Sequence, residues 1–233
     1  MDFFLGITNK CNLSCPWCAH SRLRNIDPHY EMSSKEFNRW YDLTKKAGYT
    51  FESIDINGLG EPTCYSDIDF LTYMLIRCGR FSDNVNILTN GLNLDALERV
   101  IPFCSNVEIS LWVEREDIIE FAKKHPLKVH LHKDIVKHDV SNPYTEETSS
   151  IVTKCGCSGC GYTMNTVFLV CGTWCPKIVK DDLYHTTLKE DYLQTLNKQY
   201  GLTAFDMCKR CHANTAIPYK IYGREGMYLN GSV

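Results

Sequence analysis

Short apolar segments alternate, over the first part of the chain, with segments whose apolar residues recur at helical spacing. At residues 107–113, Val107, Ile109 and Leu111 occupy every second position, which is typical of a β-strand. Comparable apolar runs predict strands at residues 3–7, 51–57, 84–88, 107–113 and 127–135. Helices are predicted between them at residues 34–47, 67–80, 95–103 and 116–124.

The first predicted helix has recognisable signals at both ends. Ser33 is a good N-cap, and Glu36 three residues later completes a capping box. Gly48 is a typical residue to end the helix. An apolar stripe at helical spacing predicts which side chains this helix buries, namely Phe37, Trp40, Tyr41 and Thr44.

The repeated alternation of strand and helix predicts a parallel sheet with right-handed crossover connections. A closed (β/α)8 barrel needs roughly 250 residues. In this sequence the alternation of predicted strands and helices ends by residue 137. We therefore expect an α/β fold, a partial, open parallel barrel of the TIM type with about five strands, at residues 1–137. A polar linker at residues 138–154 then leads to a small second domain at residues 155–233.

Composition narrows the class of protein. The chain has 233 residues, of which 44% are hydrophobic, and a formal net charge of −3. This charge indicates no nucleic-acid surface. No apolar stretch is long enough to predict a membrane span. The first residues do not resemble a signal peptide. The 13 cysteines are clustered, which favours metal ligands over disulfides and predicts a protein of the reducing cytoplasm.

Three cysteines follow the first predicted strand at C-x3-C-x2-C spacing, namely Cys11, Cys15 and Cys18. Cysteine thiolates hold iron–sulfur clusters, and three of them leave one iron of a [4Fe–4S] cluster open for a substrate or cofactor. Trp17, directly before the last cysteine, constrains the loop further. Zinc is the alternative metal, because Cys-x2-Cys pairs also hold zinc.

Two further turns follow predicted strands. Gly58-Leu59-Gly60-Glu61-Pro62 comes after the strand at residues 51–57, and its glycines let the backbone approach a ligand closely. Thr89-Asn90-Gly91 closes the strand at residues 84–88. Active sites of parallel α/β barrels lie at the carboxyl ends of their strands. We therefore expect the cysteine loop and both turns to meet at one mouth.

At these motifs the sequence resembles the radical S-adenosylmethionine (radical SAM) superfamily. GLGEP is similar to the GGEP motif of that family, with Leu59 in place of one glycine. The resemblance implies that Cys11, Cys15 and Cys18 hold a [4Fe–4S] cluster whose open iron chelates S-adenosylmethionine. It further implies that the cofactor is cleaved reductively to a 5′-deoxyadenosyl radical, which abstracts a hydrogen from the substrate.

The resemblance also implies a set of cofactor-binding residues. The turn formed by Gly58, Leu59, Gly60 and Glu61 is expected to bind the amino group of S-adenosylmethionine. Ser110, in the strand at residues 107–113, is expected at its ribose or carboxylate, although a hydroxyl satisfied within the sheet is an alternative. The remaining residues expected at the cofactor are Trp17 and Asn90.

The second domain contains seven of the 13 cysteines. An apolar strand at residues 166–171, followed by Gly172-Thr173, predicts a β-hairpin, and residues 188–200 are predicted to be helical. Cysteines around a hairpin, then a helix and a Cys-x2-Cys pair, resemble the twitch extension of radical SAM enzymes, which is the short form of the SPASM domain. The resemblance implies one auxiliary [4Fe–4S] cluster, although a zinc knuckle would fit the same ending. Its implied ligands are Cys157, Cys175, Cys208 and Cys211, with Cys155, Cys160 and Cys171 as alternates.

This resemblance implies the chemistry of twitch-type dehydrogenases, which oxidise a substrate by two electrons. After hydrogen abstraction and loss of a proton, the substrate radical passes its electron to the auxiliary cluster. The proton needs a base, and we predict that this base lies at the end of a strand. The candidate catalytic residues are His130, His132, Lys133 and Arg115, although a strand residue can point to either face.

The substrate class follows from the position of the cysteine loop. The loop begins at residue 11, which leaves no room before it for the peptide-recognition domain of some relatives. We therefore expect a small molecule such as a sugar, cyclitol or nucleotide, with an external reductant such as flavodoxin or ferredoxin. The alternatives are a peptide- or protein-modifying maturase, a glycyl-radical activating enzyme, and a non-catalytic zinc-binding protein.

Overall fold

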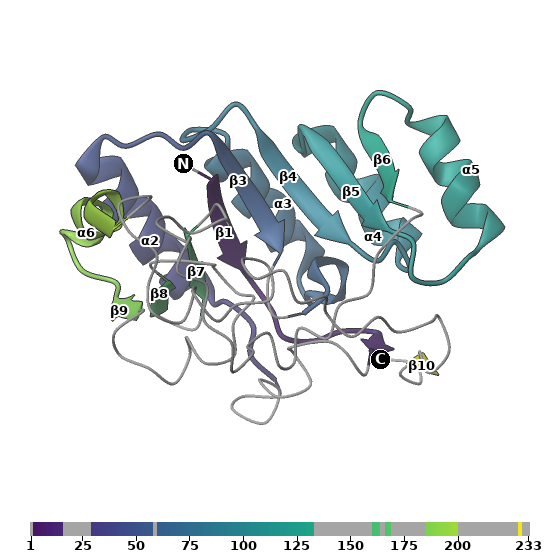
Figure 1. Cartoon of the computed structure of the whole chain (residues 1–233), viewed down its shortest axis with the longest axis horizontal. Coiled ribbons are helices and arrows are strands. Elements are labelled where there is room, and N and C mark those ends of the chain that lie inside the picture. Colours follow the sequence, from purple (N-terminus) through teal and green to yellow (C-terminus); the bar gives the residue numbers. More distant parts are fainter. Residues whose placement is uncertain are drawn as a thin grey trace, which may run out of the picture.

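The computed structural model describes residues 2–15, 29–57, 60–132, 160–163, 166–168, 185–199 and 228–229. Its main feature is an eight-stranded sheet with the order β6-β5-β4-β3-β1-β7-β8-β9 (Figure 1). The strands are β1 (Asp2–Gly6), β3 (Ser53–Asn57), β4 (Val85–Thr89), β5 (Asn106–Ser110), β6 (Val129–His132), β7 (Cys160–Thr163), β8 (Thr166–Phe168) and β9 (His185–Thr187). β1 and β3 to β6 pair in parallel, which confirms the predicted open, five-stranded parallel sheet.

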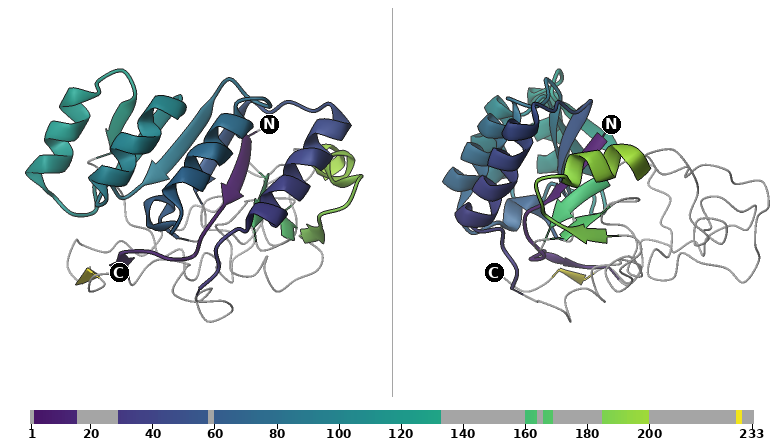
Figure 2. Two further views of the ribbon diagram at one scale, coloured as in Figure 1. Left: turned by 180° about the vertical axis from the view of Figure 1, so that it is seen from behind. Right: turned by 90° about the vertical axis from the view of Figure 1, so that its left-hand side faces the viewer.

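Four helices cover one face of this sheet, as the views from behind and from the side show (Figure 2). They are α2 (Ser34–Ala47), α3 (Ile68–Cys78), α4 (Leu94–Val100) and α5 (Glu116–Lys124), with the short 3-10 helices η1 (Pro62–Cys64) and η2 (Ile101–Phe103). The helix predicted at residues 95–103 is divided into α4 and η2, because Pro102 has no backbone N–H to continue the α-helix. Among the described helices, none combines the length and apolar character needed to cross a bilayer.

Both predicted ends of α2 are confirmed. The Ser33 hydroxyl accepts a hydrogen bond from the Glu36 N–H at 3.2 Å, and Gly48 has the left-handed φ of 63° that favours glycine. The predicted stripe is buried, with Trp40 stacked on Phe3 of β1 at a ring distance of 5.5 Å. Burying each such side chain contributes about 1.5–3 kcal/mol. Packing of this stripe therefore holds α2 on the sheet.

The two faces of the parallel sheet differ in polarity. Ile54 and Ile56 of β3 are fully buried in the core beneath the helices. Because side chains alternate along a strand, Asp55 lies on the opposite face. There it accepts a hydrogen bond from Asn86 Nδ2 at 2.8 Å, and Asn86 Oδ1 accepts one from Asn106 Nδ2 at 3.0 Å. A hydrogen-bonded polar row therefore crosses β3, β4 and β5 on the face opposite the four helices.

The described C-terminal strands extend the same sheet. β7 pairs in parallel with β1, and β8 follows as its antiparallel neighbour. The strand at residues 166–168 pairs antiparallel with residues 160–163 before it and with residues 185–187 after it, and the predicted turn at Gly172-Thr173 lies outside the described residues. Pairing with β7 satisfies the backbone groups along the edge of β1. The linker predicted at residues 138–154 lies outside the described residues.

The C-terminal helix α6 (Tyr192–Gln199) is anchored to α2. The Tyr192 hydroxyl is hydrogen-bonded to the Thr44 hydroxyl, and the Arg39 guanidinium donates to the Leu188 carbonyl at 2.8 Å. A small second sheet joins β10 (Tyr228–Leu229) to β2 (Leu13–Ser14). The C-terminal segment therefore reaches both α2 and the loop that contains Cys11 and Cys15.

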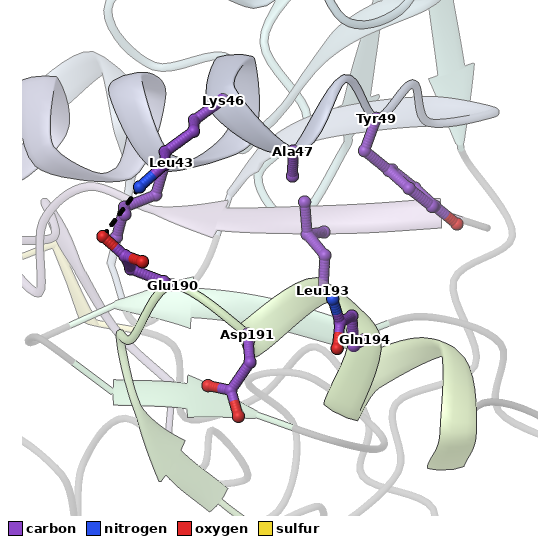
Figure 3. Close-up of a pocket in the computed structure, with 8 residues that line it drawn as sticks. All are labelled: Leu43, Lys46, Ala47, Tyr49, Glu190, Asp191, Leu193 and Gln194. Atoms are coloured by element: carbon purple, nitrogen blue, oxygen red, sulfur yellow. Dashed lines mark hydrogen bonds and ion pairs between the residues drawn. The ribbon is translucent and has the colours of Figure 1, made fainter.

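A surface cavity of about 490 Å³ lies between the end of α2 and the start of α6 (Figure 3). Leu43, Tyr49 and Leu193 contribute to its wall, and an ion pair of 2.9 Å joins Lys46 to Glu190 beside it. The end of α2 lies near the amino end of β3, which follows it in the chain. This cavity is therefore on the side of the sheet away from the carboxyl ends of the strands.

Candidate active site

The cysteine loop and both predicted turns meet at the carboxyl ends of β1, β3 and β4. These three strands are parallel neighbours, so the segments that follow them leave the sheet at one edge. That edge is where parallel α/β barrels place their active sites. The expectation of one shared mouth is confirmed for the described residues of the three segments.

Gly60 brings the GLGEP turn into backbone contact with the cysteine loop. A Cβ atom at Gly60 would lie 2.2 Å from the Lys10 carbonyl oxygen and 2.7 Å from the Asn9 carbonyl carbon. In the same contact, the Glu61 N–H donates to the Lys10 carbonyl at 2.8 Å. Only glycine permits this approach, which explains why the turn needs glycine at this position.

The Glu61 carboxylate joins the GLGEP turn to the turn formed by Thr89, Asn90 and Gly91, which we call the TNG turn. It accepts hydrogen bonds from the Thr89 hydroxyl at 2.5 Å and from the Asn90 N–H at 2.7 Å. It also accepts from the N–H and the hydroxyl of Thr63, at 3.1 and 2.8 Å. Burial raises the pKa of Glu61 above its ordinary value, and these hydrogen bonds oppose that rise. The carboxylate therefore orders both turns, while its predicted contact with a cofactor stays a prediction.

Asn90 completes the connection by binding back to the cysteine loop. Its Nδ2 donates to Asn12 Oδ1 at 2.7 Å, and its Oδ1 accepts from the Leu92 N–H at 3.0 Å. Gly91 has a φ of 75°, which the turn after β4 requires. The cysteine loop, the GLGEP turn and the TNG turn thus form one hydrogen-bonded unit.

The cysteine loop is also held from its outer side. Lys10 forms an ion pair with Glu31 at 3.0 Å and donates to the Ser66 hydroxyl at 2.7 Å. Glu31 in turn accepts from the Ser66 N–H at 2.6 Å. The start of the loop is therefore fixed on two segments of the chain.

Two of the three predicted cluster ligands lie within the described residues. Cys11 and Cys15 are half-buried, and the Leu13 N–H donates to Cys11 Sγ at 3.4 Å. Backbone N–H donors to sulfur, and soft thiolate ligands, both fit an iron–sulfur cluster. Cys18 lies outside the described residues, and within them no three metal-binding side chains gather.

Two buried asparagines beside this loop were not predicted as site residues. Asn9 has an exposed fraction of 1% and Asn57 one of 5%. Within the described part of the chain, neither amide nitrogen nor amide oxygen of either residue has a hydrogen-bond partner. The sequence signal for Asn57 was a polar residue at the end of an apolar alternating strand, directly before the glycine-rich turn. Unpaired, buried donors and acceptors of this kind fit a polar ligand between the two segments.

The described candidate catalytic residues differ in their position relative to the carboxyl ends of the strands. His132 ends β6 opposite Ser110 of β5, and its Nε2 lies 2.6 Å from Glu108 Oε2. His130 lies one pleat further from the mouth, 3.3 Å from Asn106 Oδ1. Arg115 is paired with Asp117 at the start of α5, where it lowers the pKa of that carboxyl. Of the described candidates, His132 has both the position at the mouth and a carboxylate partner.

Other predicted site residues lie outside the described residues. They are Trp17, Cys18, Gly58, Leu59, Lys133, Cys155, Cys157, Cys171, Cys175, Cys208 and Cys211. For Cys160 the structure places the backbone in β7, next to β1. The predicted roles of all these residues stay predictions.

Fold and site together define an open parallel α/β barrel with a candidate site at its carboxyl mouth. A scan against protein-family models finds no match, and a search among curated proteins finds none either. Among solved structures, the chain is similar to BtrN in complex with AdoMet and 2-DOIA, with a TM-score of 0.64 and 14% identity over 95% of this chain and 98% of that chain. BtrN in an open conformation aligns with a TM-score of 0.56 and 14% identity, over 90% of this chain and 91% of that one. At this identity the likeness shows a shared fold.

Proposed function

We propose that this chain is a radical SAM enzyme in which Cys11, Cys15 and Cys18 hold a [4Fe–4S] cluster that binds S-adenosylmethionine. When bound, the cluster and its cofactor supply a 5′-deoxyadenosyl radical that removes a hydrogen atom from the substrate. The observation that carries the proposal is the union of the cysteine loop with both turns through Gly60, Glu61 and Asn90. The fold shared with BtrN, whose structure contains AdoMet, supports it further.

Each described residue of this unit has a definable task. Lys10 fixes the start of the cysteine loop, and Gly60 lets the GLGEP turn lie against it. Glu61 holds the two turns together from a fully buried position, and Asn90 ties them to Asn12. Preorganised loops of this kind hold a bound group in one orientation.

We further propose a small polar substrate and a net two-electron oxidation. The BtrN structure is a complex with both AdoMet and 2-DOIA, which supports a second molecule bound together with the cofactor, and we propose that this molecule is of the sugar, cyclitol or nucleotide type. His132, oriented by Glu108, accepts the substrate proton in this proposal. An auxiliary [4Fe–4S] cluster accepts the electron, with Cys157, Cys175, Cys208 and Cys211 as its proposed ligands.

The test is anaerobic analysis of iron and sulfide, combined with S-adenosylmethionine cleavage after reduction. We expect about eight irons per chain in the wild type and about four after the triple change Cys11→Ala, Cys15→Ala and Cys18→Ala. Formation of 5′-deoxyadenosine should be lost in the triple variant. Cys64→Ala is the control, because Cys64 is half-buried and lies outside both cysteine groups.

Other metal contents would change the proposal in defined ways. About four irons in the wild type and none in the triple variant would remove the auxiliary cluster and with it the electron acceptor. Zinc in both cysteine groups, without any cofactor cleavage, would reject the enzyme and leave a zinc-binding protein. A stable radical on a large partner protein would favour a glycyl-radical activating enzyme instead.

A further inference from the structure

We infer that Asn57 and Asn9 bind the amino-acid group of S-adenosylmethionine through their side-chain amides. This inference rests on the proposed function, because it assigns residues to the cofactor named there. The inference adds two residues to those of the GLGEP turn, since neither asparagine belongs to a motif that indicated the cofactor site.

Both amides are buried and have no hydrogen-bond partner in the described parts of the chain. Asn9 is 1% exposed and Asn57 is 5% exposed, and none of their four amide atoms has a hydrogen-bond partner in the described parts of the chain. Native proteins leave few buried polar groups unpaired, because each one destabilises the fold. The two side chains therefore need a partner that these contacts do not provide.

Their position shows where that partner binds. Asn57 is the last residue of β3 and lies opposite Gly6, the last residue of β1. Asn9 follows three residues after Gly6, and its carbonyl carbon lies 2.7 Å from where a Gly60 Cβ would be. The two asparagines thus flank the contact between the cysteine loop and the GLGEP turn.

The chemistry of an amide selects the ligand. Each side chain presents one donor group and one acceptor, and in both residues the donor and the acceptor are unpaired. Sulfides and thiolates of a cluster are only acceptors, so they would leave both amide oxygens unsatisfied. An amino-acid group offers an ammonium or amine donor together with a carboxylate acceptor. It can therefore satisfy both ends of an amide.

Neighbouring asparagines show that unpaired amides are not general at this site. Asn86 is on the next strand, on the same face, and is 9% exposed, yet both ends of its amide are paired, with Asp55 and Asn106. Asn90 is 6% exposed and is likewise paired at both ends. The two unpaired amides are therefore distinguished from asparagines of similar burial.

The experiment compares two nucleosides that differ in the amino-acid group. Binding of S-adenosylhomocysteine and of methylthioadenosine, which lacks that group, is measured anaerobically by calorimetry on the cluster-loaded protein. For Asn57→Leu and Asn9→Leu we expect affinity for S-adenosylhomocysteine to fall about tenfold or more. Affinity for methylthioadenosine should stay within about twofold of the wild type. Asn57→Asp, which keeps the acceptor but repels a carboxylate, should show the same selective loss.

A stability measurement separates binding from a structural role. Without nucleoside, Asn57→Leu should unfold at the wild-type temperature or above it, because it removes an unpaired buried amide. The matched control Asn86→Leu should unfold at a lower temperature and keep the wild-type ratio of the two affinities. A lower unfolding temperature for Asn57→Leu, or equal losses for both nucleosides, would overturn the inference. A wild-type protein that binds neither nucleoside would instead reject the proposed function.

Discussion

The side-chain amide of Asn90 donates a hydrogen bond of 2.7 Å to the side-chain oxygen of Asn12. The two residues are 78 positions apart in the sequence, and each follows the end of a different strand. The bond ties the turn after β4 to the loop that contains Cys11 and Cys15. A contact of this kind couples the placement of the cysteines to the rest of the mouth.

A double-mutant cycle should detect this coupling. Asn12→Ala and Asn90→Ala remove the same hydrogen bond, so their effects on the free energy of unfolding should be non-additive by about 0.5–1.5 kcal/mol. Each single variant should also lower the affinity for S-adenosylhomocysteine several-fold. Urea unfolding and calorimetry measure both quantities. Additive effects would mean that the hydrogen bond does not connect the two segments in solution.

Gly60→Ala should disrupt the mouth through a backbone clash. Its Cβ would lie 2.2 Å from the Lys10 carbonyl oxygen, so the cysteine loop or the turn must move. We expect a loss of about 1–3 kcal/mol in the free energy of unfolding, with loss of the bound iron. Chemical denaturation and iron analysis measure the two effects.

Gly48→Ala is the matched control for this clash. Gly48 has a left-handed φ of 63°, but an added Cβ there would meet nothing within 4 Å. The variant should therefore lose only about 1 kcal/mol of stability and retain its iron. Equal iron loss in the two variants would show that general destabilisation, and not the contact with Lys10, removes the cluster.

His132→Asn should reduce substrate turnover far more than His130→Asn. Both histidines lie on the same face of β6, but only His132 ends the strand and has a carboxylate, Glu108, at 2.6 Å from Nε2. Loss of a general base lowers the rate by about 100-fold or more. Under the proposed function, product formation per 5′-deoxyadenosine, measured with a cyclitol as the probe substrate, should fall for His132→Asn and stay near the wild-type ratio for His130→Asn. Similar ratios in the two variants would exclude His132 as the base.

Asp55→Asn should stabilise the protein at neutral pH. Burial raises the pKa of Asp55, the Asn86 hydrogen bond opposes this, and Asp2 and Glu108 add to the rise. The unfolded chain therefore loses its proton at lower pH than the folded chain, so the wild type loses stability as pH rises through this window. The variant keeps the acceptor for Asn86 and has no charge to desolvate.

The advantage of Asp55→Asn should consequently depend on pH. It should be absent near pH 3, grow as pH rises above the ordinary aspartate range, and reach at most about 1 kcal/mol because the side chain is partly solvated. Urea unfolding at several pH values measures this difference. An advantage that is independent of pH would show that the charge of Asp55 is not its cause.

The sequence by itself determined the order and type of the elements in the first part of the chain. Alternating apolar residues predicted β3, and the stripe from Phe37 to Thr44 with caps at Ser33 and Gly48 predicted α2. These signals are local, because a strand or helix that packs on a core must repeat its apolar residues with its own period. The meeting of the cysteine loop with both turns was also predictable, since parallel strands place their carboxyl ends at one edge.

Only the tertiary structure decided which side chains join these segments and which stay unpaired. The hydrogen bonds from Thr89 and Asn90 to Glu61, the Asn90–Asn12 bond and the unpaired amides of Asn9 and Asn57 all depend on distances between distant parts of the chain. The pairing of β7 with the edge of β1 likewise depends on the folded chain, because the two strands are far apart in the sequence. Local propensity cannot specify such contacts, because a polar side chain or a strand edge is satisfied by whatever group the folded chain brings within reach.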